Sequence, residues 1–315
     1  MSILQRCQKG SAAVIAACFL AACGGGGGSV SNTTPAPAEP VAPGSPAVTG
    51  NVATDGVNWI NFRRSQAGLS VLARTALIDS ATFNHSEYQR ANNTVAHDEI
   101  AGRPGFTGVT PLERLQHVGY FFTGGYAYGE VISGATSSSG QFLAEELITA
   151  IFHRFVIFEP KFKEVGGGSA VNGSGYTYFT TNFTANNGFG TGLGAGQLVS
   201  WPVNGQTGVT RDFRSDFESP DPVPGIDLVG YPVSVHGDIN VTLNVTSFTI
   251  KPRGGANMNV QLLAANNPGD VHTPSSAAAI VPLTVLAAST TYDVSFSGTS
   301  NGTAISKTWS FTTKP

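Results

Sequence analysis

The spacing of apolar residues divides this chain into a helical part and a β-rich part. From about residue 54 to residue 160, apolar positions recur mostly every three or four residues, which is the period of an amphipathic helix. In the first such segment Thr54 or Asp55 is the expected N-cap, and Gly68 is expected to end the helix. The predicted helices cover 54–68, 75–92, 112–118 and 140–153.

The pattern then changes to short runs rich in Val, Thr and Phe, separated by turn residues. Two of these runs flank Asn172-Gly173, which predicts a β-hairpin over 163–185. The Gly-bounded segment 128–134 is expected to be extended. A Gly- and Asn-rich linker follows at 186–197, and helical spacing is absent beyond it. The strands expected there, at 239–250, 259–265, 290–299 and 307–313, are typical of an antiparallel β-sandwich.

The first 23 residues have the composition of an export signal and not of a folded element. Arg6 and Lys9 precede an apolar stretch at 11–20, and small residues then lead to Cys23. The apolar stretch is shorter than the roughly 20 residues that a transmembrane helix needs. A cysteine at this point resembles the lipobox of bacterial lipoproteins, which implies lipid attachment at Cys23. Residues 24–50 are rich in Gly, Pro, Ser and Ala and are expected to form a tether.

The cysteines and the net charge indicate whether disulfide bonds and nucleic-acid binding are to be expected. Cys7 and Cys18 lie in the signal, and Cys23 would carry the lipid, so no disulfide is expected after export. Without Arg6 and Lys9 the chain keeps 15 basic and 20 acidic residues, a net charge of −5. No basic stripe remains, and nucleic acid is therefore not an expected partner.

Four side chains with imidazole or charged groups lie between residues 97 and 153, namely His97, Arg114, Glu130 and His153. Such groups are scarce elsewhere, because only 12% of the residues are charged and only six are histidines. Two imidazoles and a carboxylate brought together can hold Zn²⁺ or another divalent ion, relay a proton or bind a polar ligand head. This cluster is the candidate site, and His97 and His153 are its candidate metal ligands.

The order of short motifs around this cluster resembles the CAP superfamily (cysteine-rich secretory proteins, antigen 5 and pathogenesis-related proteins), specifically its bacterial SCP-like branch. The resemblance runs from about residue 57 to residue 183. It is carried by NxxR with GL at 61–69, HS at 85–86, a histidine at 97, R…GY at 114–120, GE at 129–130, HR…P at 153–160, and VGGG before the last strand pair. It implies an α-β-α sandwich over 51–197, so the whole chain is expected to be α+β.

The resemblance also implies a cleft that contains two histidines and two acids. His97 matches the first cleft histidine, Glu130 the acid of the GEN-type motif, and His153 the second histidine. The chain departs from the family where valine follows Glu130, and again where LITAIF stands at the place of the second acid. Glu145 or Glu146, one to two helical turns before His153, is the substitute candidate for that acid.

Other polar residues have structural interpretations. His85 lies beside apolar residues of its predicted helix and is expected to be packed and hydrogen-bonded. Arg114 is expected to clamp Glu130 or backbone carbonyls, because a guanidinium forms bidentate hydrogen bonds. In the β-rich part, His236 and His272 have no ligand-like neighbours and are expected at the surface.

The C-terminal part, 228–315, resembles bacterial Ig-like domains, most clearly in the run TTYDVSFSGTSNGTAISKTWSFTT. This resemblance implies a spacer or an adhesive module. The stretch 198–227 is rich in Pro and Asp and is expected to be an ordered connector that packs Trp201 and Phe213 against one of the two domains.

Together these features favour an envelope-anchored binding protein whose His/Glu cleft takes a small or lipid-like ligand or a surface protein partner. The sequence has no HExxH, no GxSxG and no free thiol, so an enzyme is not favoured. Two alternatives stay open: a metal-assisted hydrolase that uses His97, Glu130 and His153, and a structural or adhesive surface protein. The expected location is the bacterial cell envelope, and the outer membrane in a Gram-negative source, because Gly24 and not Asp follows Cys23.

Overall fold

The computed structural model describes residues 44–315. The predicted signal, the lipid-attachment residue Cys23 and the tether up to residue 43 lie outside the described residues. Within 44–315, no helix combines the length and the apolar composition needed to cross a membrane.

The first helix, α1 (Val52–Gln66), begins two residues before the predicted start. Asn51 is its N-cap, and the Asn51 side chain accepts a hydrogen bond from the Thr54 amide at 2.9 Å. Asp55 instead accepts from the amide of Thr49 at 2.8 Å, which fixes the segment before the helix. The N-cap prediction was therefore wrong because an earlier side chain was available to bind the free amides of the first turn.

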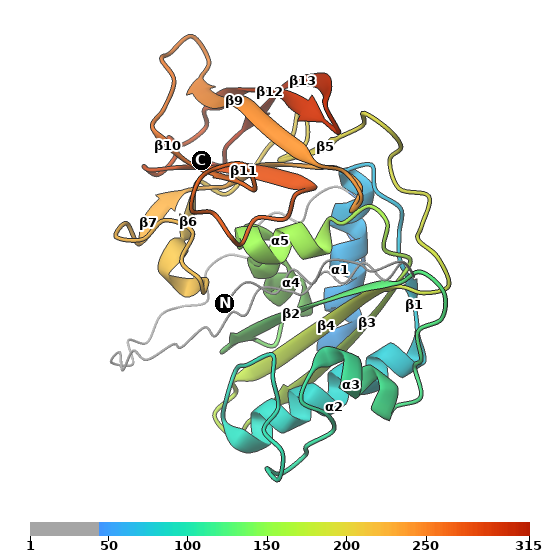
Figure 1. The fold of residues 1–315 in the computed structure, drawn as a ribbon. Helices are drawn as coiled ribbons and strands as arrows, with labels where there is room; N and C mark the ends of the chain where they lie inside the picture. The colour runs from blue at the N-terminus through green and yellow to red at the C-terminus, as the bar shows by residue number, and fades with distance from the viewer. Residues whose placement is uncertain (1–43) are drawn as a thin grey trace.

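A four-stranded sheet forms the middle layer of the N-terminal part. Its strands are β1 (Ala73–Arg74), β2 (Ala127–Ala135), β3 (Glu164–Val171) and β4 (Thr177–Ala185), in the order β1-β3-β4-β2. Strand β4 is antiparallel to both β2 and β3, as the hairpin prediction requires. Figure 1 shows α2 (Ala76–Asn92) and α3 (Pro111–His117) on one face of this sheet and α1, α4 (Gly140–Thr149) and α5 (Ile151–Ile157) on the other. The prediction of an α+β chain is confirmed.

The glycines of the VGGG motif allow α2 to lie directly on β3. A Cβ atom at Gly168 would collide with the backbone of Phe83, and one at Gly166 would collide with the backbone of Ile78 and Asp79. Glycine is required at both positions because the helix backbone and the strand backbone approach closely.

The helix predicted over 140–153 is two helices in the structure. The backbone of Ala150 is extended (φ −66°, ψ 120°), so α4 ends before it and α5 begins after it. The Arg154 guanidinium donates to the carbonyls of Ile148 and Thr149, which a continuous helix would have used itself. The amides at the start of α5 bind the carboxylate of Glu218.

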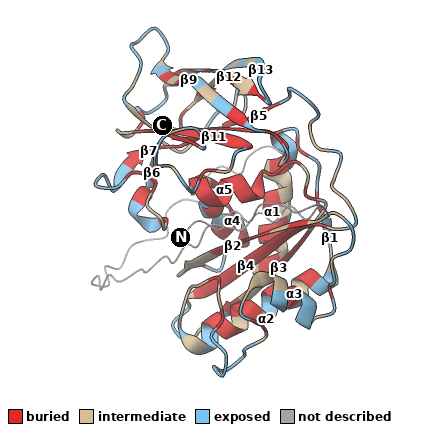
Figure 2. Ribbon diagram, in the orientation of Figure 1, coloured by how far each residue is buried: buried red, intermediate tan, exposed pale blue. Residues whose placement is uncertain are grey.

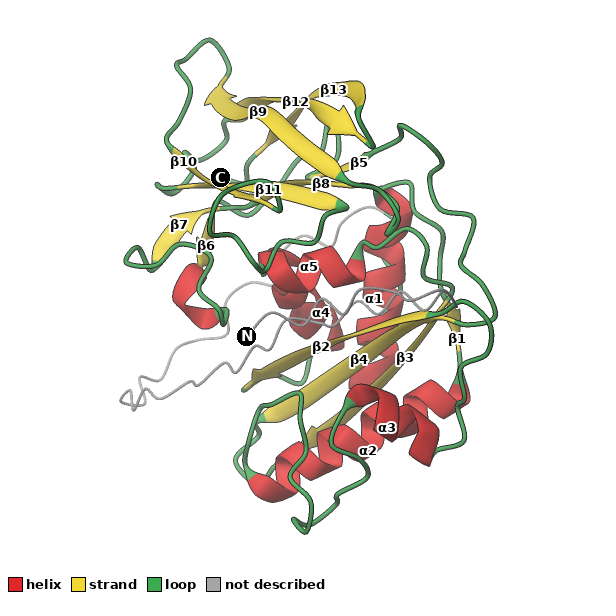
Figure 3. Cartoon of the chain, in the orientation of Figure 1, coloured by secondary structure: helices red, strands yellow, loops and turns green. Residues whose placement is uncertain are grey.

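The C-terminal part contains two larger sheets and a short strand pair (Figure 3). One sheet has the order β10-β11-β8-β5, the second β13-β12-β9, and β6 pairs with β7. All of these pairings are antiparallel. The strands are β5 (Val199–Trp201), β6 (Asp212–Arg214), β7 (Leu228–Gly230), β8 (Val233–His236), β9 (Leu243–Pro252), β10 (Val260–Ala264), β11 (Ala277–Pro282), β12 (Thr291–Ser300) and β13 (Thr303–Thr312), and a 3₁₀ turn covers Ser215–Phe217. The expected connector at 198–227 thus supplies a strand, β5, to the first of these sheets.

The N-terminal and C-terminal parts share buried surface (Figure 2). Trp201 of β5 is fully buried, its indole N–H donates to the Tyr231 hydroxyl at 2.9 Å, and its ring packs edge-on against Phe158. Phe213 packs in a second apolar cluster with Phe155 of α5. Helix α5 is therefore covered by the sheet β1-β3-β4-β2 on one side and by the C-terminal part on the other.

His236 is buried in β8, and its expected surface position was wrong. Its Nε2 lies 2.9 Å from the Ser234 hydroxyl, and its ring packs edge-on against Phe155 and Phe158. Burial lowers the pKa of His236 well below 6.5, so the ring is neutral. Every residue of β8 is buried because α5 and the second sheet cover its two faces. His272 is exposed.

Candidate functional site

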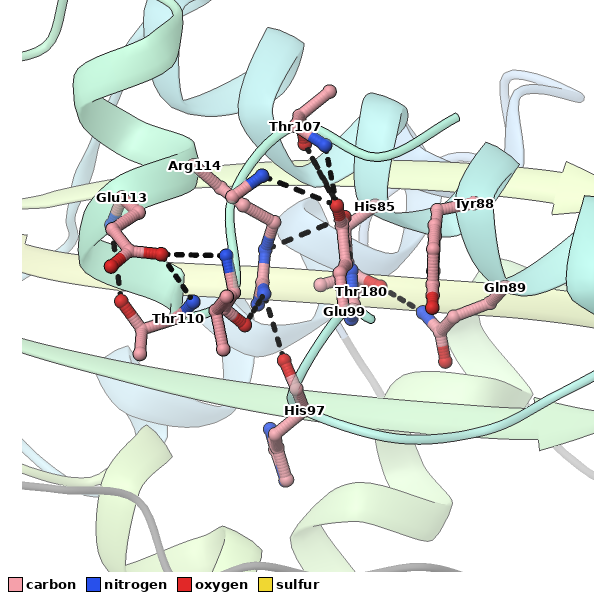
Figure 4. Close-up of polar contacts among 12 residues, drawn as sticks. His85, Tyr88, Gln89, His97, Glu99, Thr107, Thr110, Glu113, Arg114 and Thr180 are labelled. Carbon is pink, nitrogen blue, oxygen red and sulfur yellow. Dashed lines mark hydrogen bonds and ion pairs between the residues drawn. The ribbon is translucent and has the colours of Figure 1, made fainter. Parts of the chain in front are cut away.

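A buried ion pair between Arg114 and Glu130 joins α3 to β2. Both Glu130 oxygens lie 2.8 Å from Nη2 of Arg114, and each side chain is about 1% exposed. Nη1 of Arg114 also donates to the carbonyl oxygens of His97 at 2.8 Å and Val109 at 3.1 Å. Figure 4 shows Arg114 reaching from its helix toward His97. One guanidinium thus fixes both the carboxylate and the backbone of the neighbouring histidine.

The carboxyl group of Glu130 is ionised at neutral pH. Burial alone would raise its pKa, but the charge of Arg114 and the hydrogen bond with His97 act in the other direction and bring the pKa to about 2. An ionised carboxylate only accepts hydrogen bonds. Any ring nitrogen that contacts Glu130 must therefore carry a proton.

His97 lies in the loop between α2 and α3, with Nδ1 2.9 Å from Oε1 of Glu130. Because Glu130 only accepts, Nδ1 of His97 carries a proton, and in the neutral form of the ring Nε2 is therefore the nitrogen with the lone pair. His97 is 5% exposed, and its Nε2 has no hydrogen-bond partner among the described residues. A buried acceptor of this kind is costly unless a ligand or a water molecule supplies a donor.

His85 belongs to a neighbouring, fully paired cluster that Arg114 connects to Glu130, because Nε of Arg114 lies 3.9 Å from Oε1 of Glu99. Its Nδ1 lies 2.9 Å from Oε1 of Glu99, and its Nε2 lies 2.8 Å from the Ala96 carbonyl oxygen. Glu99 also accepts from the amides of Thr107 and Gly108. These contacts, most of which appear in Figure 4, leave no ring nitrogen of His85 free for a ligand. His85 therefore shapes the loop that carries His97.

His153 lies on α5 and binds a different carboxylate. Its Nδ1 is 3.0 Å from Oε1 of Glu218, and both side chains are at most about a tenth exposed. Glu218 also accepts from the backbone amides of Ile151 and Phe152 at 2.8 Å and of His153 at 3.2 Å. The acid partner of His153 thus comes from the connector, 65 residues further along the chain.

The two glutamates expected to replace the second cleft acid do not contact His153. Glu145 accepts from the Arg63 guanidinium at 2.9 Å and from the Trp59 indole at 2.6 Å, so it joins α4 to α1. Glu146 is exposed on α4. Neither residue is among the hydrogen-bond partners of His153, whose ring binds Glu218.

His97 and His153 were the candidate metal ligands, and each binds its own carboxylate through Nδ1. Within residues 44–315, no group of three or more His, Cys, Asp or Glu side chains is arranged to hold a metal ion. The contacts therefore join His97, Glu130 and Arg114 into one group and place His153 with Glu218 in another.

Sequence reasoning missed the acid partners Glu99 and Glu218. Glu99 stands two residues after His97 in the run HDE, which is a local signal for an acid beside a histidine-bearing loop. Glu218 has no comparable signal, because it lies in a Pro- and Asp-rich connector far from His153 in the sequence.

Two solved structures are similar to part of this chain. An extracellular protein containing a SCP domain from Bacillus anthracis is 24% identical over 42% of this chain and 39% of that chain, with a TM-score of 0.36. An outer surface protein from Borrelia burgdorferi is 14% identical over 42% of this chain and 90% of that chain, with a TM-score of 0.35. No protein-family model matches the chain, and no curated protein matches its sequence. Both TM-scores are below 0.5, so these similarities carry no argument about the family of this chain.

Proposed function

We propose that this chain is an extracytoplasmic binding protein of the SCP-like type, whose site at His97 receives the polar head of a small or lipid-like ligand. One observation carries the proposal. The His97 imidazole is held by a buried, ionised carboxylate, and its buried Nε2 has no partner in the described part of the chain. Such a nitrogen accepts a hydrogen bond from a ligand hydroxyl, amine or amide.

The surroundings of Glu130 favour a ligand that also has an apolar body. Tyr128 precedes Glu130 by two residues on β2, so both side chains project from the same face of the strand. Phe122 lies 5.8 Å from the Tyr128 ring and stacks on Tyr126 at 4.5 Å between ring centroids. These three aromatic residues are half-buried. They provide an apolar surface next to a site for one polar group, which is the arrangement that an amphiphilic ligand requires.

Replacing His97 by alanine should remove the ligand from the protein. The matched control is His117→Ala, which removes an exposed histidine from α3. The chain and both variants would be purified without detergent in a Cys23→Ser background and compared by native mass spectrometry. We expect the same bound mass on the parent and on His117→Ala, and at least a tenfold smaller occupancy on His97→Ala, because a buried hydrogen bond is lost. Equal occupancy in all three, or no bound mass on the parent, would contradict the proposal.

The metal-assisted hydrolase predicts a different result, which a comparison of the parent with His97→Ala and an added variant, His153→Ala, would reveal. A zinc ion would use the Nε2 lone pair of His97, and Zn²⁺ prefers three or four protein ligands. Calorimetric titration with Zn²⁺ separates the two functions. Binding by the parent that is lost in both His97→Ala and His153→Ala would favour the hydrolase over the organic ligand.

We further propose that the protein is anchored to the cell envelope through a lipid on Cys23. The support is the order of a positive start, an apolar stretch and small residues before that cysteine. Cys23→Ser should move the protein from the membrane fraction to the soluble fraction, because the remaining apolar stretch is too short to span a bilayer. Immunoblots of the two fractions give the readout. Unchanged membrane association of Cys23→Ser would exclude the anchor.

A further inference from the structure

Two buried carboxyl groups, those of Glu159 and Asp238, lie where the N-terminal and C-terminal parts of the chain meet. Glu159 comes just after α5, Asp238 comes just after β8, and each residue is only 4% exposed. Oε1 of Glu159 accepts from the backbone amides of Lys161 at 2.9 Å and of Ile239 at 3.0 Å. Glu159 therefore joins the segment after α5 to the loop after β8.

Asp238 fixes the linker 186–197 to the same place. Its carboxylate oxygens accept from the backbone amides of Leu193 at 2.7 Å and of Gly194 at 3.2 Å. A Cβ atom at Gly192 would collide with this carboxylate, so the linker backbone lies directly against it. The two carboxyl groups thus hold three segments of the chain together at one junction.

The two carboxyl groups differ in the cations that they contact. Oδ2 of Asp238 lies 3.7 Å from Nζ of Lys161. In residues 44–315, no ion pair joins the carboxyl group of Glu159 to a cation. The buried guanidinium of Arg64 is near, but its Nη1 donates to the backbone carbonyl oxygens of Ile157 and Glu159. A charge on Glu159 would therefore be buried without an ion-pair partner and would face the charge of Asp238.

The ionisation of Glu159 follows from these surroundings. Burial raises its pKa from 4.5 to about 8, and the charge of Asp238 adds to this rise, against the two amide hydrogen bonds and the charge of Arg64. Between these two values the closed junction keeps a proton that a hydrated Glu159 releases. The closed junction is thus favoured most below pH 4.5, and this advantage is lost as the pH rises to about 8. His236 in β8 stays neutral over this range, because burial holds its pKa well below 6.5.

We propose that Glu159 and Asp238 form a pH-sensitive latch, which holds the linker 186–197 and the loop after β8 against the N-terminal part in mild acid and loosens in mild alkali. Opening of the junction allows water to reach the ionised carboxylate of Glu159, which burial next to Asp238 denies it. The latch adjoins α5, which the C-terminal part covers, so opening exposes the end of this helix. The latch does not depend on the ligand proposed for His97.

Hydrogen exchange of the full chain, followed by mass spectrometry of its peptides, tests this proposal. Glu159→Gln keeps an acceptor oxygen but cannot ionise, and a comparison with the parent at the same pH cancels the intrinsic pH dependence of exchange. In peptides that cover 186–197 and 237–241, the ratio of the exchange rates of parent and variant should rise at least about tenfold from pH 5 to pH 8 and then level off. The turn between β12 and β13, at 300–303, should show a constant ratio. Glu87→Gln, an exposed change on α2, should exchange like the parent at every pH.

Asp238→Asn keeps the test informative if Glu159→Gln does not fold, which circular dichroism would reveal. This variant removes the charge that faces Glu159, so the pH at which the loss of protection levels off should be lower than in the parent. A ratio of parent to Glu159→Gln that stays constant from pH 5 to pH 9 would overturn the proposal. An equal rise in the turn at 300–303 would also overturn it, because the whole chain and not the junction would then be loosened.

Discussion

Replacing Arg114 by methionine is expected to lower the free energy of unfolding by about 3 to 5 kcal/mol. The substitution leaves the Glu130 carboxylate buried without the guanidinium nitrogen that binds both of its oxygens. It also removes the donor that satisfies the carbonyl oxygens of His97 and Val109. Urea unfolding of the parent and the variant, followed by far-ultraviolet circular dichroism, measures the difference.

The matched control is Arg90→Met on α2. Arg90 forms its ion pair with Glu87 at the surface, where both side chains are more than a third exposed. Exposed pairs of this kind contribute little to stability, so this control should unfold nearly as the parent does. If Arg114→Met lost no more stability than Arg90→Met, the pair of Arg114 and Glu130 would not be the support of the site.

The ion pair of Arg114 and Glu130 also makes the free energy of unfolding of the parent depend on acid pH. The pKa of Glu130 is about 2 in the folded protein and 4.5 ordinarily, so its contribution is present above 4.5 and lost as the pH falls toward 2. This loss amounts to about 3 kcal/mol. In Arg114→Met the pKa of Glu130 rises, and the stability of the variant should therefore fall less between pH 4.5 and pH 2 than that of the parent.

Glu218→Ala should lower the free energy of unfolding by about 3 kcal/mol or more. Three backbone amides at the start of α5 and Nδ1 of His153 would lose their acceptor together. The break between α4 and α5 depends on this acceptor, because the amides of a new helix need partners where the preceding helix no longer supplies them. Urea unfolding gives the readout, and Glu218→Gln, which keeps one acceptor oxygen, should fall between the alanine variant and the parent.

Asp216→Ala provides the comparison within the same connector. Asp216 pairs with Arg214 at the surface, so removing it should change the free energy of unfolding only slightly. Equal losses in Asp216→Ala and Glu218→Ala would show that the buried carboxylate does not hold α5 in place.

The elements that could be predicted are those with a local signal. The helix over 75–92 and the hairpin over 163–185 have clear periodicity and turn residues, and both are present. The break at Ala150 could not be predicted, because its cause is the distant Glu218 and the local sequence has no Gly or Pro. Strand β5 is only three residues long, which is too short for periodicity to be recognised.

The candidate site could be predicted in part for the same reason. The motif order brought attention to His97, Arg114 and Glu130, and the structure places these three in direct contact. The partner of His153 could not be anticipated, because the search for a second acid stayed within the preceding helix. Burial of His236 was missed because a strand covered on both faces shows no alternation. Contacts between the two parts of the chain therefore account for most of what the sequence did not reveal.

The tautomer of His97 tests the role of Glu130 most directly. Long-range ¹H–¹⁵N correlation spectra of the protein labelled in its histidine rings report which ring nitrogen carries the proton. In the neutral form of the His97 ring, we expect a protonated Nδ1 and an unprotonated Nε2, since the ionised Glu130 accepts from Nδ1. In Glu130→Gln this preference should weaken. A His97 ring with its proton on Nε2 in the parent would contradict the account, because the nitrogen proposed to accept the ligand would then be a donor.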